Sequence, residues 1–303
     1  MASKCCKKMC HYLGFSGEPV QRFVLPQAKW PLAPVLWTLY RCFVAVYLTV
    51  WLGLILSVWG EPPFYRQADV KAKWLIYVSN WSFLVLTLYL ITMAVGNVYY
   101  HATHGCKNTS VGADIDPESD PEGMIPMSSV HSPRGVPVSG DDGAEPLPPL
   151  PWYFKFAWFL QAVVYSSGLF VALNFYILVF DPATSTLHAY NFHIHGVNLI
   201  IIVLDLILAA TPMRVLHLVY PSALAFVYFV FTLIYEGVGG LNEFGGTAIY
   251  VGFLDWGAAP VTSGIVMAIV VLVAAPVIHL IFYAFYRIRQ AISKCCTGYC
   301  WTY

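Results

Sequence analysis

Six long apolar stretches decide what this chain can fold into. A helix needs about 20 mainly apolar residues to cross the hydrocarbon core of a bilayer. Six windows meet that requirement, namely Val35–Trp59, Trp74–Tyr99, Tyr153–Phe180, Phe192–Ala210, Val215–Tyr235 and Val261–Phe285. Of the 303 residues, 58% are hydrophobic and 11% are charged, whereas soluble domains carry about 25% charged residues. The sequence therefore predicts an all-α integral membrane protein, a bundle of six transmembrane helices.

The basic residues predict which side of the membrane each loop occupies. With the N-terminus inside, all of the 16 lysines and arginines except Arg66, Lys71 and Lys73 fall on the cytosolic side. Cytosolic loops are enriched in these residues, so both termini are predicted to be cytosolic. The expected membrane is the plasma membrane or the endoplasmic reticulum. The formal net charge is zero, so composition does not indicate a nucleic-acid partner.

Five segments follow from this topology. Residues 1–34 form a cytosolic N-terminal segment that contains cysteines and lysines, and residues 35–100 hold transmembrane helices one and two. Residues 101–151 form a polar cytosolic loop rich in Pro, Gly, Ser and Asp, which is predicted to be disordered. Residues 152–287 hold transmembrane helices three to six, and residues 288–303 form a cytosolic tail that contains cysteines.

The cysteines near the chain ends are candidates for lipidation, because none of the 8 cysteines falls in a predicted exterior loop. Cysteines beside lysines at a membrane surface suit S-palmitoylation, and free cytosolic thiols explain them equally well. The N-terminal cysteines lack a matching second pair of zinc ligands, so no metal or cofactor is predicted. The lipidation candidates are Cys5, Cys6, Cys10, Cys295 and Cys296.

The fourth window carries polar residues inside an apolar stretch. His195 and Asn198 are three residues apart and Asp205 lies seven beyond, so at 3.6 residues per turn the three share one helix face. His193 points elsewhere and lies closer to the interface. Ionisable groups inside a membrane helix usually face the protein interior and mark a functional site. A seam of hydrogen bonds between helices explains the same stripe, because polar side chains also hold membrane helices together.

Ser79 is the candidate nucleophile for such a site. It lies early in the second window, as His195 does in the fourth, and both helices start from the same side of the membrane. The two groups therefore share a depth. A serine hydroxyl becomes a nucleophile when a base within hydrogen-bond reach takes its proton, and His195 is the candidate base. Asn198 or Asp205 would orient the histidine or bind substrate. A small residue that allows close helix approach is the other interpretation of Ser79.

Several motifs together resemble the rolling stone family of multipass membrane proteins. The motifs are His195-Gly-Val-Asn198, Leu204-Asp205, Thr211-Pro-Met-Arg-Val-Leu-His217, Tyr220-Pro221, Phe231-Thr-Leu-Ile-Tyr235 with Gly239-Gly240, and Ile249-Tyr-Val-Gly-Phe-Leu-Asp-Trp256 with Pro260. The resemblance covers the chain from about residue 22 to residue 289, apart from the polar loop. It implies a role in myoblast fusion and muscle development, and it implies no biochemical mechanism.

The layout is more distantly similar to the androgen-inducible six-span hydrolases. That resemblance implies cleavage of fatty-acid esters of hydroxy fatty acids by an intramembrane threonine and histidine. The threonine falls by position at Ser79 and the histidine at His195. The present chain therefore departs from that pattern by having serine, which keeps the hydroxyl.

Three classes of function remain open from the sequence. The first is an intramembrane lipid-ester hydrolase whose substrate enters from the bilayer, with Ser79 as nucleophile and His195 as general base. The second is a non-enzymatic membrane protein for cell–cell contact or fusion, whose polar stripe is structural. The third is a transporter, although the paired discontinuous helices and inverted repeats typical of transporters are not evident in the sequence. Membrane lipids are the expected partners in each case.

Overall fold

The computed structural model describes residues 12–27, 33–59, 70–105, 148–183, 187–250 and 252–299. Within these residues, six helical spans are long and apolar enough to cross a membrane. The spans are Ala33–Val58, Val78–His104, Trp152–Val179, Ala189–Leu208, Val215–Gly237 and Pro260–Ser293. Each overlaps its predicted window, so the six-helix prediction is confirmed. The chain is an integral multipass membrane protein.

Three of the spans contain a π-helical segment, and two are preceded or begun by a 3₁₀ helix. The elements that build the spans are α3 (Ala33–Val58); η1 (Val70–Ile76) and α4 (Val78–His104); α5 (Trp152–Asn174) and η3 (Phe175–Val179); α6 (Ala189–Asn191), η4 (Phe192–Val197) and α7 (Asn198–Leu208); η5 (Val215–Leu218) and α8 (Val219–Gly237); and α9 (Pro260–Ile269), η6 (Val270–Ala274) and α10 (Ala275–Tyr299). The π segments are η3, η4 and η6.

Local sequence explains several helix ends. Pro151 precedes α5, and Pro260 is the first residue of α9, where proline costs nothing because the first N–H groups of a helix have no partner within it. Gly105 follows α4 with a φ of 74°. A left-handed residue at this position is typical of helix termination. The π segment η6 ends at Ala274, two residues before Pro276.

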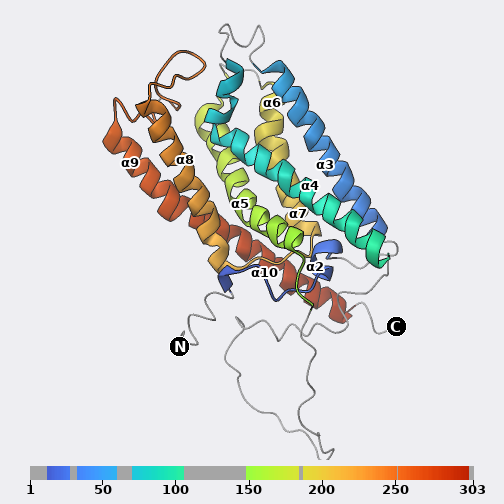
Figure 1. Cartoon of the computed structure of the whole chain (residues 1–303). Helices are drawn as coiled ribbons and strands as arrows, with labels where there is room; N and C mark the ends of the chain where they lie inside the picture. The colour runs from blue at the N-terminus through green and yellow to red at the C-terminus, as the bar shows by residue number, and fades with distance from the viewer. Residues whose placement is uncertain are drawn as a thin grey trace, which may run out of the picture.

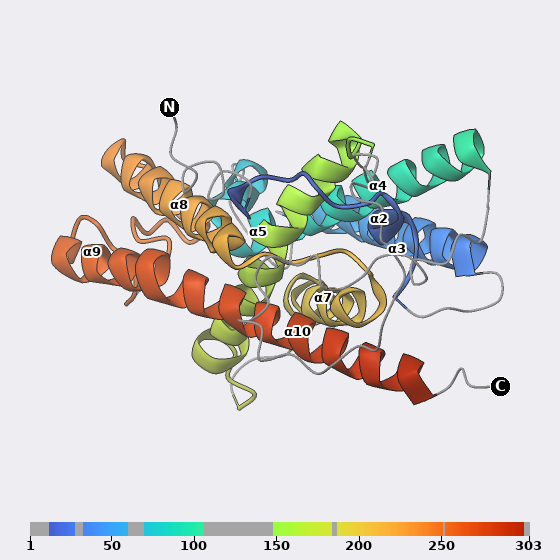
Figure 2. The same ribbon diagram turned by 90° about the horizontal axis from the view of Figure 1, so that it is seen from below.

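The helices form an inner and an outer group. The α4 and α5–η3 spans are the most buried, followed by the span that contains α7. Spans α3, α8 and α9–α10 are the least buried and present apolar side chains outward. Figure 1 shows α3 on one side of α4 and α5, with α8 and α9 on the other. Seen from below, α10 crosses under α5 and alongside the end of α7 (Figure 2).

The two ends of the bundle are distinguished by their short helices. The short helix α2 (Gln21–Val24) lies at the lower end in Figure 1, which we call the α2 end, and α6 lies at the opposite end, which we call the α6 end. At the α2 end, residues 12–27 pack onto the helices. Arg214 donates to Gly14 O and Ser16 O at 2.9 and 2.7 Å, and Phe15 packs against Trp158 with ring centroids 5.4 Å apart.

A buried ion pair joins the outer helix α3 to the inner helices. The guanidinium of Arg41 pairs with Asp205 Oδ1, and both side chains are almost fully buried. Tyr89 of α4 and Tyr165 of α5 donate to Asp205 Oδ2 at 2.6 and 2.7 Å. The Arg41 guanidinium also lies over the ring of Trp37, 4.4 Å from its centroid. One carboxylate therefore connects four helices, and its charge is balanced where water is excluded.

Several of the segments and residues named in the sequence lie outside the described residues. They include residues 106–147 of the polar loop and the lipidation candidates Cys5, Cys6 and Cys10. The backbone of α10 continues through Cys295 and Cys296, whose side chains are not described. Palmitoylation and the cytosolic placement of the termini stay predictions.

Breaking the Arg41–Asp205 pair from one side should destabilise the protein strongly. Arg41→Met or Asp205→Leu alone leaves one buried charge without its partner, at an expected cost of about 3–5 kcal/mol in the free energy of unfolding. The combined variant Arg41→Met/Asp205→Leu/Tyr89→Phe/Tyr165→Phe removes every polar member and should recover most of that loss. Thermal unfolding in detergent measures both effects. Single variants that unfold at the wild-type temperature would contradict this assignment.

Candidate functional site

Two hydrogen bonds fix how α4 and α7 lie against each other. Both helices run from the α6 end towards the α2 end, so they are parallel. Tyr89 of α4 donates to Asp205 of α7 across a sequence separation of 116 residues. Seven residues closer to the α6 end on both helices, Asn198 Nδ2 donates to Ser82 Oγ at 3.5 Å, again across a sequence separation of 116 residues. The two helices therefore keep one register over seven residues.

Extended by three residues into η4, this register brings Ser79 to about the level of His195, because these residues are also 116 positions apart. Ser79 is the second residue of α4 and is half-buried. His195 lies in η4 and is buried, with 8% of its surface exposed. Among the described residues, no hydrogen bond joins the two side chains. The predicted pair thus shares a level in the bundle without direct contact.

The π segment η4 explains how His195 is oriented. In a π helix each N–H bonds five residues back, so its turns hold more residues than α turns. His195 therefore does not follow the 3.6-residue spacing from which the shared face was predicted. Its ring lies flat on Phe175 of η3, with centroids 3.8 Å apart and planes 2° apart. Its Nδ1 atom is buried and has no hydrogen-bond partner.

Asn198 belongs to a small polar cluster one level below. Ser82 Oγ accepts hydrogen bonds from Asn198 Nδ2 and from Ser167 Oγ, the latter at 3.3 Å. Asn198 and Ser82 are fully buried. Asn198 Oδ1 has no partner, so it is open to a further donor. The cluster connects α4, α5 and α7 directly beneath the level of Ser79 and His195.

Asp205 lies farther from these residues, within the ion pair described above. Its two oxygens are engaged by Arg41, Tyr89 and Tyr165. From the sequence, Asp205 is a candidate for binding substrate or orienting the histidine. The structure instead places Asp205 among residues that join α3, α4 and α5 to α7. It can therefore affect His195 only through the position of α7.

His193 has partners that the sequence analysis did not identify. Its Nε2 atom lies 2.8 Å from Tyr47 Oη, and its ring stacks on Trp51 with centroids 3.4 Å apart. Tyr47 and Trp51 are four residues apart on α3, so they share a helix face. That spacing of two aromatic residues with polar atoms is the signal that could have suggested a histidine partner.

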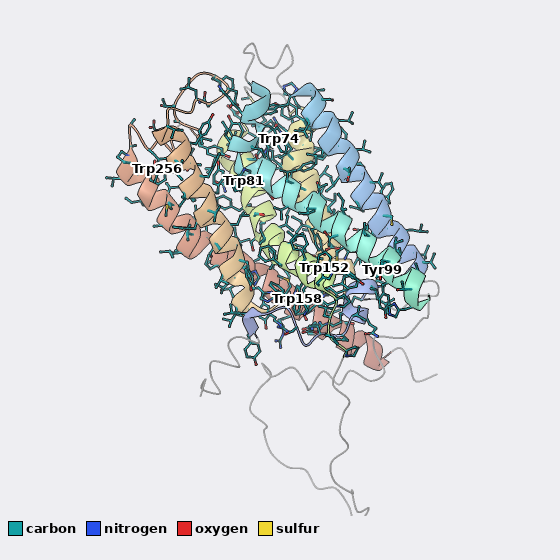
Figure 3. The ribbon with its side chains drawn as sticks, viewed as in Figure 1. Trp74, Trp81, Tyr99, Trp152, Trp158 and Trp256 are labelled. Carbon is teal, nitrogen blue, oxygen red and sulfur yellow. The ribbon has the colours of Figure 1, made fainter. Side chains whose placement is uncertain are left out.

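The loop between α8 and α9 covers the start of α4. Tyr77, the residue before α4, donates its hydroxyl proton to Glu243 of this loop. The backbone N–H of Val78 donates to Tyr250 Oη at 3.2 Å, and Lys73 Nζ donates to Asn242 O at 2.9 Å. Figure 3 shows Trp74 and Trp81 at this end of the bundle, with Trp256 farther along the loop side. The loop therefore contacts the two residues immediately before Ser79.

The described residues contain no group of three or more His, Cys, Asp or Glu side chains that could hold a metal ion. The polar atoms near Ser79 and His195 are instead hydroxyl, amide and imidazole groups. Such groups can transfer protons and donate hydrogen bonds to an acyl oxygen.

Comparison with known proteins establishes the family. The family model described as protein rolling stone matches residues 150–302, which is about half of the chain. The chain belongs to the rolling stone family. The protein rolling stone of Drosophila melanogaster is 25% identical over 245 residues, which cover 80% of this chain and 74% of the fly protein. No solved structure matches the chain.

The residues matched by the rolling stone model include only part of the candidate site. It includes His195, Asn198 and Asp205, together with Glu243 of the α8–α9 loop. Ser79 lies before the matched residues. The family model therefore covers the candidate base His195 and the α8–α9 loop. The assignment of Ser79 as candidate nucleophile depends instead on the register between α4 and α7.

Burial gives Glu243 an acid–base property that can be tested. Its pKa is raised because burial disfavours the charged carboxylate, and its own backbone N–H and Lys73 offset part of this effect. Burial also raises the pKa of Tyr250 to about 12, so Tyr250 remains protonated near neutral pH. A raised carboxyl pKa means that the folded state binds the proton more tightly than the unfolded state.

The contribution of Glu243 to stability should therefore fall as the pH rises from the unmodified pKa of 4.5 through its raised folded value. Comparing wild type with Glu243→Gln isolates this group, because every other titratable side chain is common to the two proteins. We expect the thermal midpoint of wild type to decline relative to the variant as the pH rises above 4.5. Parallel curves for the two proteins would refute the assignment.

Proposed function

We propose that this rolling stone protein is an intramembrane lipid-ester hydrolase with Ser79 as nucleophile and His195 as general base. The observation that carries the proposal is the register of α4 and α7, which sets Ser79 level with a buried histidine. Hydrogen bonds between catalytic groups are often long in the absence of substrate and tighten when it binds. A shared level with an unpartnered Nδ1 atom on His195 is compatible with that behaviour.

The proposed reaction has two steps. Ser79 Oγ attacks the acyl carbonyl carbon while His195 takes the hydroxyl proton, and the tetrahedral intermediate collapses as His195 returns that proton to the leaving alcohol. Water then attacks the acyl-serine, with His195 again accepting and donating one proton, and a free fatty acid is released. Asn198 would orient these groups or donate to the oxyanion. The mechanism requires no metal and no cofactor.

The location of the pair favours a lipid substrate. Ser79 and His195 lie early in two apolar spans, and the helices around them present apolar side chains outward. An acyl chain that enters laterally from the bilayer would reach them without crossing water. We therefore propose a lipid ester as the substrate class and membrane lipids as the immediate partners.

A second candidate is a non-enzymatic role in cell–cell contact or fusion, including myoblast fusion during muscle development. One observation favours it. Asp205 of the polar stripe is bonded to Arg41, Tyr89 and Tyr165, so this carboxylate joins helices to one another. In that case the rest of the stripe would also be structural. The two candidates differ in whether Ser79 is chemically activated.

Labelling with a lipid-like fluorophosphonate tests the hydrolase directly, because this probe reacts with activated serine hydroxyls. Wild type in detergent should be labelled, and Ser79→Ala and His195→Ala should not. Ser79→Thr should retain labelling because it keeps a hydroxyl. Removing an essential nucleophile or base typically lowers the rate by about a thousandfold or more. Hydrolysis of a fluorescent lipid ester gives a second readout.

Ser57→Ala is the matched control for these variants. Ser57 lies near the end of α3 at the α6 end, is exposed, and donates only to Leu54 O at 2.7 Å. It should be labelled as wild type is. If Ser79→Ala and His195→Ala, folded by thermal midpoint, turn over lipid ester at the wild-type rate, the hydrolase mechanism is wrong.

A further inference from the structure

The loop that joins α8 to α9 is anchored firmly on the α8 side. Tyr235 donates its hydroxyl proton to Leu241 O at 2.9 Å. The Glu236 carboxylate accepts from the backbone N–H of Trp256 at 2.9 Å and of Gly257 at 2.5 Å. These bonds tie both ends of the loop to the last turns of α8. The loop thereby presents residues between its ends to the neighbouring helix α4.

Within the loop, Asn242 fixes the turn that carries Glu243. Its Oδ1 atom accepts from the backbone N–H of Phe244 and of Gly246, at 2.9 and 2.8 Å. Its Nδ2 atom donates to Ala248 O at 2.9 Å. A turn closed by three side-chain bonds holds its backbone in one conformation. Glu243 therefore projects from a built turn, and its side chain reaches Tyr77.

The start of α4 depends on this loop. Tyr77 is the residue that precedes the helix, and it makes no side-chain hydrogen bond that caps it. The first four N–H groups of a helix lack partners within it, and uncapped ends fray. Here the N–H of Val78 is satisfied by Tyr250 Oη, and the side chain of Tyr77 is held by Glu243. Contacts from the loop replace the missing cap.

Ser79 belongs to the turn that these contacts fix, because it directly follows Val78. If the first turn of α4 opens, Ser79 leaves the level that the register of α4 and α7 gives it. We propose that Glu243 and Tyr250 of the α8–α9 loop are positioning residues that hold Ser79 in place through Tyr77 and Val78. The inference rests on the proposed hydrolase function, since it assigns these residues a role in presenting that nucleophile.

Tyr77→Phe and Glu243→Ala remove the contact to α4, and Glu243→Gln retains an acceptor for the Tyr77 hydroxyl. Displacement of a reacting atom by about 1 Å can lower a rate by about a hundredfold. We therefore expect fluorophosphonate labelling of Ser79 to slow by about tenfold or more in Tyr77→Phe and Glu243→Ala. Glu243→Gln should stay near the wild-type rate. Tyr250→Phe, which loses the acceptor for Val78 N–H, should behave like Tyr77→Phe.

Tyr235→Phe is the matched control. It removes a tyrosine hydroxyl bond to the same loop, but on the α8 side. Labelling at the wild-type rate is expected for it, with a thermal midpoint similar to that of Tyr77→Phe. Equal slowing in Tyr235→Phe and Tyr77→Phe would mean a general loosening of the loop and would overturn the specific role of the α4 contacts.

A second measurement does not depend on catalysis. In a variant whose native cysteines are replaced by serine, Ser79→Cys carries a single thiol, and its alkylation rate by a maleimide reports how tightly the first turn of α4 is held. Adding Tyr77→Phe or Glu243→Ala should raise that rate severalfold, and adding Tyr235→Phe should not. Unchanged alkylation in all three would overturn the positioning role. Wild type that resists fluorophosphonate, together with a raised alkylation rate, would overturn the hydrolase alone.

Discussion

The Asp205 carboxylate is the interaction on which the rest of the structure depends. It accepts hydroxyl protons from α4 and α5 and pairs with a guanidinium from α3, so one side chain of α7 contacts three other helices. Each bond to a charged acceptor contributes about 1.5–3 kcal/mol where the group is buried and satisfied. Since lipid supplies no hydrophobic force between helices, such directional contacts decide how they align.

The alignment set at Asp205 is transmitted along α7 to the α6 end. The bond between Asn198 and Ser82 repeats the separation found between Asp205 and Tyr89, so α7 neither slides nor rotates against α4 between these levels. Beyond Asn198 the backbone becomes π-helical, and His195 turns onto Phe175. Isolated π turns occur frequently at functional sites. The α-helical part of this span, α7, thus sets the depth of His195 in the bundle, and the π-helical η4 sets the direction of its ring.

The two ends of the molecule are stabilised by different means. At the α2 end, arginine side chains bind backbone carbonyls: Arg214 holds residues of the N-terminal segment, and Arg289 donates to Leu206 O and Ala209 O, where α7 ends. A cation at a helix C-terminus is favourable because of the helix dipole. At the α6 end, hydroxyl groups and one loop carboxylate hold the start of α4.

Much of the fold could be predicted from the sequence, because the length of an apolar window follows from bilayer thickness. The ends of the spans differ from the predicted windows by a few residues, except where α10 continues beyond its apolar part. The partner of Asp205 could not be predicted. The sequence places Arg41 with the cytosolic charges because it lies near a helix start, whereas its burial depends on how the helix is rotated. The π turn at His195 and the Tyr77–Glu243 contact also escaped prediction, since both depend on packing between segments far apart in the sequence.

Cysteine crosslinking measures the register of α4 and α7 directly. In the same cysteine-free background, Ser82→Cys/Asn198→Cys should crosslink readily with an oxidant or a short bifunctional thiol reagent, because these side chains are in contact. The account predicts that Ser79→Cys/His195→Cys also crosslinks with the bifunctional reagent, at a lower rate, because these residues share a level without direct contact. Ser79→Cys/Ile200→Cys should not crosslink, since Ile200 is 51% exposed on the outer face of α7. Efficient crosslinking of the 82/198 pair without that of the 79/195 pair would contradict the proposed site.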